Sequence, residues 1–465
     1  RPSGGGAFGA APSGGGAFGA APSGGGAFGG TNNQSSNSNN LLPIDADYLG
    51  KLKGQIVDVM NTETEKLDPN KACTESEAVA QYASSLSGAS NEGDYMIGFD
   101  VGGSTTDILV LTNLKGQKTL VKQNSLKIAA GQLAEATSYV PGFADFLKDF
   151  AQTNNMGKIH AIQNMSQTTV PFCFNQIVDA LDEDVALNKF YGGIASTCKP
   201  LMWMNLYITG LNIFYAGMIS RKLRTLSENT DELRNNPISS VSLEYFGKGS
   251  RIYDWFKAVD PDNAKNYNMQ CFMAGYGPEA NQHLSGFNDS LFTQKPSANF
   301  LADGSDDIKV EVAKGLAIDP NAGNQTIAKM RSMVSEIIGE DGYMLRVDGE
   351  EPILLDSLSD VSPAIIQRIG SQLMPPRDGY PRFQSFLEQW FTFSQQCFGL
   401  TVPGEQVIQA MKQMNVTDEL MRDEDFKKAQ MNAKNGEFDF SSSLFAIQAR
   451  AFMKTFIIPL MQKGG

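Results

Sequence analysis

Residues 99–108 read FDVGGSTTDI and join two apolar runs, at 95–101 and 108–112. Short apolar runs bounded by glycines and small polar residues predict buried β-strands. The pair Lys115-Gly116 predicts a turn into a third strand at 119–121. This part of the chain therefore predicts a strand, a tight glycine-rich turn, a second strand, a hairpin and a third strand.

The turn carries residue types that suit a phosphate group and a divalent cation. Glycines let backbone N–H groups approach phosphate oxygens, and small hydroxyl side chains add further donors. A carboxylate at the end of a strand can hold a hydrated Mg²⁺. A Walker A loop is excluded because no Gly-Lys-Ser/Thr follows, and an ordinary structural turn remains an open alternative. The candidate residues are Asp100 for the cation and Gly102, Gly103, Ser104, Thr105 and Thr106 for the phosphates.

The same residues resemble the phosphate-binding motif of the second domain in the actin, DnaK-type chaperone and sugar-kinase ATPase superfamily. Its pattern, D-[LIV]-G-G-[GST]-T-x-D, is matched by Asp100, Val101, Gly102, Gly103, Ser104, Thr105 and Asp107. The resemblance implies an α/β, actin-like (ribonuclease H-like) ATPase fold with ATP and Mg²⁺ as ligands. It also implies that Asp100 is the catalytic and metal-holding residue and that Asp107 belongs to the nucleotide site. The terminal Asp107 favours the chaperone and bacterial-actin branches, and hydantoinase-type proteins carry a similar string.

A second segment resembles the adenosine motif of this superfamily, which is a strand followed by G-G-x-S-R-I and a helix. Residues 241–252 read VSLEYFGKGSRI, so Lys248 separates the two glycines that are adjacent in the family pattern. An ordinary strand-to-helix turn is the alternative. The resemblance implies nucleotide contacts from Gly247, Gly249, Ser250 and Arg251.

Three helices are expected where the order of elements in the superfamily places them. Residues 75–82, ESEAVAQY, and 312–317, VAKGLA, are similar to the two connecting helices that form the interdomain hinge. A helix at 217–226, with Arg221 and Arg224, is a candidate for the helix that contacts the base in the chaperones. The alternative for this last helix is a solvated charged face.

Sequence patterns divide the 465 residues into four parts. Residues 1–40 hold the repeated unit PSGGGAFGAA and an Asn/Ser run, which predict a disordered Gly-rich tether with phenylalanine stickers. The resemblance implies that residues 41–92 are helices that end a first ATPase domain and form the hinge, and that residues 93–320 are the second ATPase domain, with a helical insertion at 132–237. Residues 321–465 predict a mainly helical C-terminal extension.

Other local patterns give further expectations. The apolar stretch 201–218 contains several polar residues and predicts a buried core helix rather than a membrane span. A strand is predicted at 238–246 and a helix at 250–259, followed by loops up to 306. A hairpin is predicted at 343–355 with its turn at Asp348-Gly349, and an apolar helix is predicted at 444–461.

Composition limits the partners. The chain has 38 Lys and Arg residues against 51 Asp and Glu residues, a net charge of −13, so nucleic acid is not expected as a main partner. Five cysteines without paired spacing and two histidines predict neither a disulfide framework nor a zinc site. These features predict a cytoplasmic protein.

The motifs account for one of the two domains between which the superfamily binds its nucleotide. No second D-x-G-[ST] strand precedes Tyr95, so the first domain is expected upstream of Arg1 or on another chain. Three functions follow as hypotheses. The first is an ATP-driven conformational switch or assembly protein that acts with protein partners or by self-assembly. The second is a non-hydrolysing interaction scaffold, and the third is a hydantoinase- or reactivase-type protein.

Overall fold

The computed structural model describes residues 78–82, 91–292, 328–329 and 336–463, with short gaps inside the two long ranges. The predicted tether at 1–40 and the second connecting helix at 312–317 lie outside the described residues. Of the first connecting helix, residues 78–82 are described, and they are helical.

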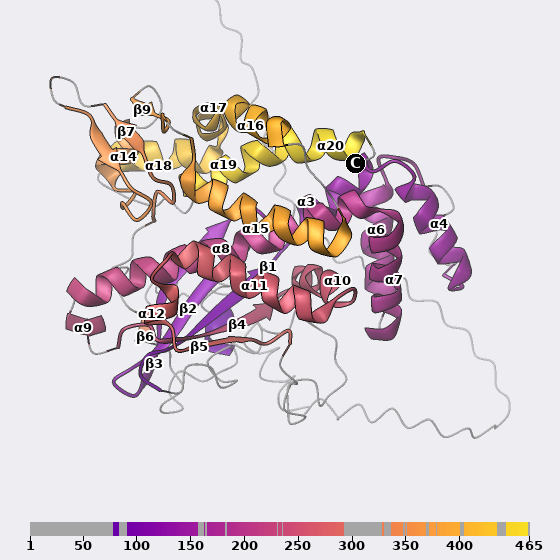
Figure 1. Ribbon diagram of the computed structural model, residues 1–465, viewed down its shortest axis with the longest axis horizontal. Helices are drawn as coiled ribbons and strands as arrows, with labels where there is room; N and C mark the ends of the chain where they lie inside the picture. The colour runs from indigo at the N-terminus through magenta and orange to yellow at the C-terminus, as the bar shows by residue number, and fades with distance from the viewer. Residues whose placement is uncertain are drawn as a thin grey trace, which may run out of the picture. The chain divides into compact units, whose positions relative to one another are not determined.

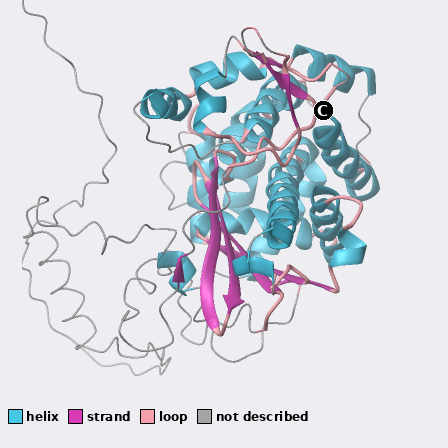
Figure 2. Ribbon diagram, turned by 90° about the vertical axis from the view of Figure 1, so that its left-hand side faces the viewer, coloured by secondary structure: helices cyan, strands magenta, loops and turns pink. Residues whose placement is uncertain are grey.

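A six-stranded mixed sheet lies at one side of the helices (Figures 1 and 2). Its order is β5-β4-β1-β2-β3-β6. Strand β2 pairs antiparallel with both β1 and β3, whereas β4 pairs with β1, β5 with β4 and β6 with β3 in parallel. The strands are β1 Asp94–Val101, β2 Thr106–Leu114, β3 Gln117–Leu126, β4 Ser240–Phe246, β5 Gly286–Asp289 and β6 Ala328–Lys329.

The three predicted N-terminal strands and the Lys115-Gly116 turn are confirmed. Lys115 and Gly116 have φ of 54° and 80°, and the flanking residues Leu114 and Gln117 pair directly. Positive φ at both central residues is the type I′ hairpin geometry, which matches the twist of the strands it joins. The hairpin therefore continues β2 directly into β3.

The predicted insertion between β3 and β4 is helical. Its longest helix is α8, in which every residue from Pro200 to Ser220 is buried. The prediction of a buried core helix at 201–218 is confirmed, and its polar residues have internal partners: Asn205 donates to the carbonyl of Ile252 at 2.8 Å. The helices of this region are α3 Ala130–Ala136, η3 Thr137–Tyr139, α4 Phe143–Thr153, α6 Val170–Ala180, α7 Asp184–Thr197, α8 Lys199–Asn229 and α9 Asp231–Arg234.

The predicted loops after residue 260 are wrong, because Pro261–Tyr276 form helix α11. Asp260 caps this helix by accepting a hydrogen bond from the N–H of Asn263, and proline occupies the first turn, where its missing N–H costs nothing. Glycines then let α11 cross α8 closely: a Cβ on Gly217 would lie 2.2 Å from the carbonyl oxygen of Phe272. The other elements between β4 and β6 are η4 Lys248–Tyr253, α10 Asp254–Lys257 and α12 Ala280–His283.

The C-terminal part adds a small sheet and a layer of helices. The predicted hairpin is confirmed, but Leu345 pairs with Ile353, so seven residues separate the strands and Asp348-Gly349 lie within a longer loop. The elements are β7 Tyr343–Leu345, β8 Ile353–Leu355, α14 Pro363–Arg368, β9 Leu373–Met374, α15 Pro381–Phe398, α16 Gly404–Gln413, α17 Val416–Arg422, α18 Glu424–Lys434, α19 Leu444–Phe452, the π-helical turn η5 Met453–Ile457 and α20 Ile458–Gln462.

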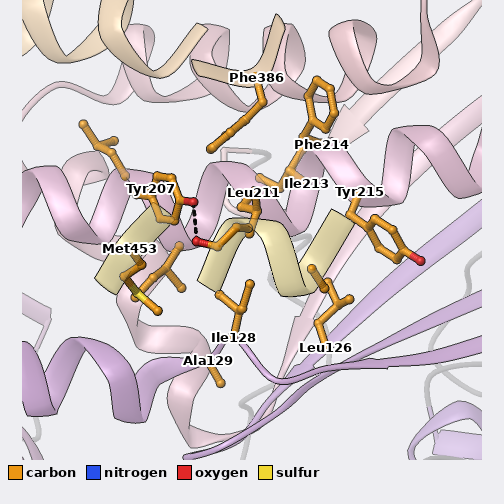
Figure 3. Packing of buried hydrophobic residues seen from close by; sticks show 14 of the residues in the cluster. Leu126, Ile128, Ala129, Tyr207, Leu211, Ile213, Phe214, Tyr215, Phe386 and Met453 are labelled. Atoms are coloured by element: carbon orange, nitrogen blue, oxygen red, sulfur yellow. Dashed lines mark hydrogen bonds between the residues drawn. The ribbon is translucent and has the colours of Figure 1, made fainter. Parts of the chain in front are cut away.

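Helix α8 lies between the sheet and the C-terminal helices. Figure 3 shows its side chains between Phe386 of α15 on one side and the segment that follows β3 on the other. The rings of Trp203 and Trp390 stack with centroids 4.4 Å apart, and the hydroxyl of Tyr207 donates to the carbonyl of Ala449 at 2.8 Å. The C-terminal helices and the six-stranded sheet with its helices therefore share one core.

The opposite face of the sheet carries a smaller cluster. Val79 and Ala80 of the first predicted connecting helix pack there with Met96, Leu109, Leu111, Leu120 and Phe246. Among the described residues, one helical stretch, Leu444–Gln462, is long and apolar enough to cross a membrane, and 67% of its most apolar part is buried within the fold.

Candidate functional site

The two predicted nucleotide motifs meet at one edge of the sheet. Because β1 and β4 run in parallel, their carboxyl ends lie together, and Asp100 pairs with Phe246 in the register. This edge is where ligands bind in open α/β sheets. The β1–β2 turn, residues 102–105, and the turn from β4 into η4 at Gly247 are therefore neighbours, although about 140 residues separate them in the sequence.

The β1–β2 turn presents part of its backbone to solvent. Gly102 donates its N–H to the carbonyl of Thr105 at 2.9 Å, which closes the turn and occupies that donor. Gly102, Gly103 and Ser104 are exposed, Thr105 is half-buried, and a Cβ on Gly103 would meet nothing within 4 Å. The groups that face open space are thus those of residues 103 to 105.

Three glycines from other segments press against this turn. A Cβ on Gly131, in α3, would lie 2.0 Å from the carbonyl oxygen of Gly103, which already accepts the Gly131 N–H at 2.7 Å. A Cβ on Gly249 would lie 2.5 Å from the carbonyl oxygen of Val101, and one on Gly247 would lie 2.4 Å from Oδ1 of Asp100. Backbone contact with two other segments therefore sets the position of the turn.

Two carboxylates stand side by side where the strands end. Asp100 and Asp107 are directly opposite in the β1–β2 register, and both are half-buried. Residues in this relation have Cβ atoms about 4.5–5.5 Å apart on one face of the sheet. Among the described residues no group of three or more His, Cys, Asp and Glu side chains converges. Two carboxylates suit a cation that keeps most of its water ligands, as Mg²⁺ does.

Thr106 does not belong to the exposed turn, which corrects one predicted contact. Its side chain is fully buried, and its hydroxyl donates to the carbonyl of Ile128 at 2.8 Å. Nδ2 of Asn212 in α8 lies 3.3 Å from the same hydroxyl oxygen. Thr106 is two residues before Ile108, so both side chains lie on the same face of β2, which packs on the helical core. There Thr106 links β2 to α8.

The η4 segment is held mainly by its own backbone and by the insertion. Ser250 donates its N–H to the carbonyl of Gly247 at 3.0 Å, and Lys248 between the glycines is exposed. Arg251 donates from Nη1 to the carbonyl of Val178, in the last turn of α6, at 3.3 Å. The structure thus directs the Arg251 guanidinium to α6. Of the four predicted residues, Gly249 lies close to the carbonyl of Gly102 in the β1–β2 turn, and Gly247 lies close to Asp100 and Val101 at the end of β1.

The basic helix predicted to contact the base lies at the other end of the sheet. Arg221 and Arg224 are near the end of α8, which leads through α9 to the start of β4, and β4 begins opposite Asp94, the first residue of β1. Arg221 pairs there with Glu279 at 3.8 Å. These residues do not join the site, because α8 runs the length of the sheet away from the β1–β2 turn.

Sequence reasoning missed two residues at this edge. Gly131 is one, and its signal was only a short run of small residues, AAG at 129–131. The other is Asp289 at the end of β5, which is buried and accepts hydrogen bonds from Asn268 Nδ2 at 2.8 Å and from the N–H of Leu291 at 3.1 Å. Burial raises the pKa of Asp289 to about 6. The bond from Asn268 anchors the end of β5 to α11, and the bond from Leu291 closes the turn that follows β5.

No protein-family model, curated protein or solved structure matches the chain.

Proposed function

We propose that the chain binds ATP with Mg²⁺ at the β1–β2 turn and acts as a nucleotide-dependent conformational switch or assembly protein of the actin and chaperone type. The observation that carries the proposal is the contact between two motifs far apart in the sequence. Gly249 of the adenosine-like segment packs on the backbone of Val101 and Gly102 in the phosphate-like segment. The strand order and the mixed pairing are compatible with the ribonuclease H-like fold that the resemblance implies.

The residues present fit a phosphate group and a hydrated cation. The N–H groups of Gly103 and Ser104 and the hydroxyls of Ser104 and Thr105 lie on the exposed side of the turn and would donate to phosphate oxygens. Asp100 and Asp107 would hold the water shell of Mg²⁺, which when bound neutralises charge on the phosphates. We leave Gly102 N–H and the Thr106 hydroxyl out of the proposed contacts, because both are engaged within the fold.

The adenosine end of the proposed site is less complete in this part of the chain. Gly247 and Gly249 face the β1–β2 turn, so their contribution is to bring η4 close to the phosphates. We propose that the opposite wall of the cleft comes from another domain or another chain, as in the superfamily that the motif resembles. Closure of the two walls around ATP would then move the first connecting helix, which packs on the back of the same sheet.

Location and partners are part of the same proposal. The described cysteines, Cys173, Cys198, Cys271 and Cys397, are free thiols, which supports a reducing, cytoplasmic location. Protein partners or self-assembly are proposed as the output of the switch.

Calorimetric titration of the full chain with ATP, with and without Mg²⁺, tests the site. Asp100→Asn keeps the shape of the side chain and removes its charge, so we expect the Mg²⁺-dependent gain in ATP affinity to fall by about tenfold or more. Asp262→Asn, at an exposed position in the first turn of α11, is the matched control and should bind as the parent chain does. Equal Mg²⁺-dependent binding by Asp100→Asn and the parent, or no ATP binding by the parent, would contradict the assignment.

Turnover and pelleting measurements separate the functional classes. ATP hydrolysis together with Mg-ATP-dependent sedimentation supports the switch or assembly protein. ATP binding without hydrolysis or sedimentation supports the non-hydrolysing scaffold instead. Activation of a partner enzyme without sedimentation supports the reactivase-type alternative.

A further inference from the structure

A hollow opens on the surface of the insertion, away from the β1–β2 turn. It has a volume of about 420 Å³ and lies between α4 and α7, which Figure 1 shows beside α6. A volume of this size accommodates a small ligand or a few side chains of a partner. Its lining residues are Gly142, Asp145, Phe146, Asp149, Phe150, Thr153, Asn154, Lys189 and Thr197.

The floor of this groove is aromatic. Phe146 and Phe150 of α4 pack on Phe190 of α7, with ring centroids 5.9 and 4.7 Å away. Gly193 lets α7 come close to this floor, because a Cβ there would lie 3.1 Å from the ring of Phe146. Phe146 is half-buried, so part of its ring remains accessible from the groove.

One rim of the groove carries unpaired negative charge. Asp145 and Asp149 are one turn apart on the same face of α4, and both are exposed. Within the described part of the chain, neither carboxylate takes part in a hydrogen bond or an ion pair. The basic residue on the other side, Lys189, donates to Oδ1 of Asn154 at 3.3 Å rather than to either aspartate.

We propose that this groove binds an arginine side chain of a partner protein, with the guanidinium at Asp145 and Asp149 and the methylene stem on Phe146. Two carboxylates next to an aromatic floor offer the two contacts that arginine makes best, charge-assisted hydrogen bonds and stacking on a ring. A bare divalent cation is disfavoured because the floor offers it no oxygen ligands. The groove is independent of the nucleotide site, since it is built entirely from the insertion.

Saturation-transfer difference NMR on the full chain tests this site. The probe is an octapeptide with one central arginine flanked by alanine and leucine, and its control is the same peptide with citrulline, which has nearly the same shape and no charge. We expect saturation transfer to the arginine methylenes, and an affinity about tenfold lower for citrulline. Asp145→Asn/Asp149→Asn should weaken arginine binding by about tenfold, and Glu388→Gln/Glu405→Gln, which removes two exposed charges on α15 and α16, should change it by less than about twofold.

A second variant keeps the test decisive if the double aspartate change disturbs folding. Thr153→Arg places a guanidinium of the chain itself in the groove and should prevent peptide binding while circular dichroism stays unchanged. Equal binding by the groove variants and the parent would overturn the proposal. So would an equal loss in the Glu388→Gln/Glu405→Gln control, which would indicate diffuse charge attraction, or the absence of saturation transfer from the parent chain to the arginine peptide.

Discussion

Replacing Gly131 by alanine gives the sharpest test of how the β1–β2 turn is held. In an exposed helix this change raises stability by up to about 1 kcal/mol, because alanine is the better helix former. Here the new Cβ would lie 2.0 Å from the carbonyl oxygen of Gly103 and 2.9 Å from its carbonyl carbon. The two backbones must therefore separate by about 1 Å, and overpacking of this kind costs about 1–3 kcal/mol.

The separation also weakens the hydrogen bond from the Gly131 N–H to the Gly103 carbonyl, now 2.7 Å long. Such a bond contributes about 1 kcal/mol. Adding the two losses and subtracting the helix-propensity gain, we expect Gly131→Ala to lower the free energy of unfolding by about 1–3 kcal/mol.

Urea unfolding, followed by circular dichroism and fluorescence, measures the change. Gly192→Ala is the matched control, because Gly192 is also helical but a Cβ there meets nothing within 4 Å, so this variant should be more stable by about 0.5–1 kcal/mol. Gly103→Ala, also in open space, should change stability by less than about 0.5 kcal/mol. If Gly131→Ala is as stable as the parent or more stable, the close contact between α3 and the turn is refuted.

Two further predictions concern the core. Burial raises the pKa of Glu340 to about 7 from 4.5, so the stability that this group contributes is complete below pH 4.5 and is lost as the pH rises toward 7. The free energy of unfolding should fall by about 2–3 kcal/mol over that interval, and urea titrations at several pH values measure this fall. The fall should be smaller for Glu340→Gln. It should also be smaller for Asp289→Asn, because Asp289 is a second carboxyl with a raised pKa, of about 6. Trp203→Ala removes the ring stacked on Trp390 and should lower the free energy of unfolding by about 3–5 kcal/mol. Phe172→Ala is the control, because this side chain is 58% exposed, and its free energy of unfolding should differ from that of the parent by less than about 0.5 kcal/mol. Calorimetric melting distinguishes the two variants.

Local patterns were sufficient for most of the sheet. Glycine-bounded apolar runs located β1 and β2, and Lys115-Gly116 located the hairpin because a left-handed pair joins two strands directly. Helix α11 was missed because polar and small residues such as Asn268 and Gly275 occupy several of its buried positions, so its apolar stripe is weak. Its cap, Asp260 followed by Pro261, was nevertheless a usable signal.

The candidate site was predictable in its residues and only partly in its geometry. Period-two alternation from Ile108 already places Thr106 on the core face, so the burial of its hydroxyl could have been foreseen. The contact of Gly131 with Gly103 could not, because it joins two segments through backbone atoms and leaves no mark on side-chain chemistry. The distance between the two motifs likewise depended on the parallel pairing of β1 with β4, which no local pattern specifies.

The burial of α8 also has a consequence for synthesis on the ribosome. One side of this helix is covered by α15 and α19. The hydroxyl of Tyr207 donates to the carbonyl of Ala449, which is synthesised 242 residues later. At about 5–20 residues per second, the apolar side of α8 stays without its final cover for roughly 10–50 s after it has been made. We expect the nascent chain to depend on a holding chaperone during that interval, and slow translation of residues 230–440 to increase its aggregation.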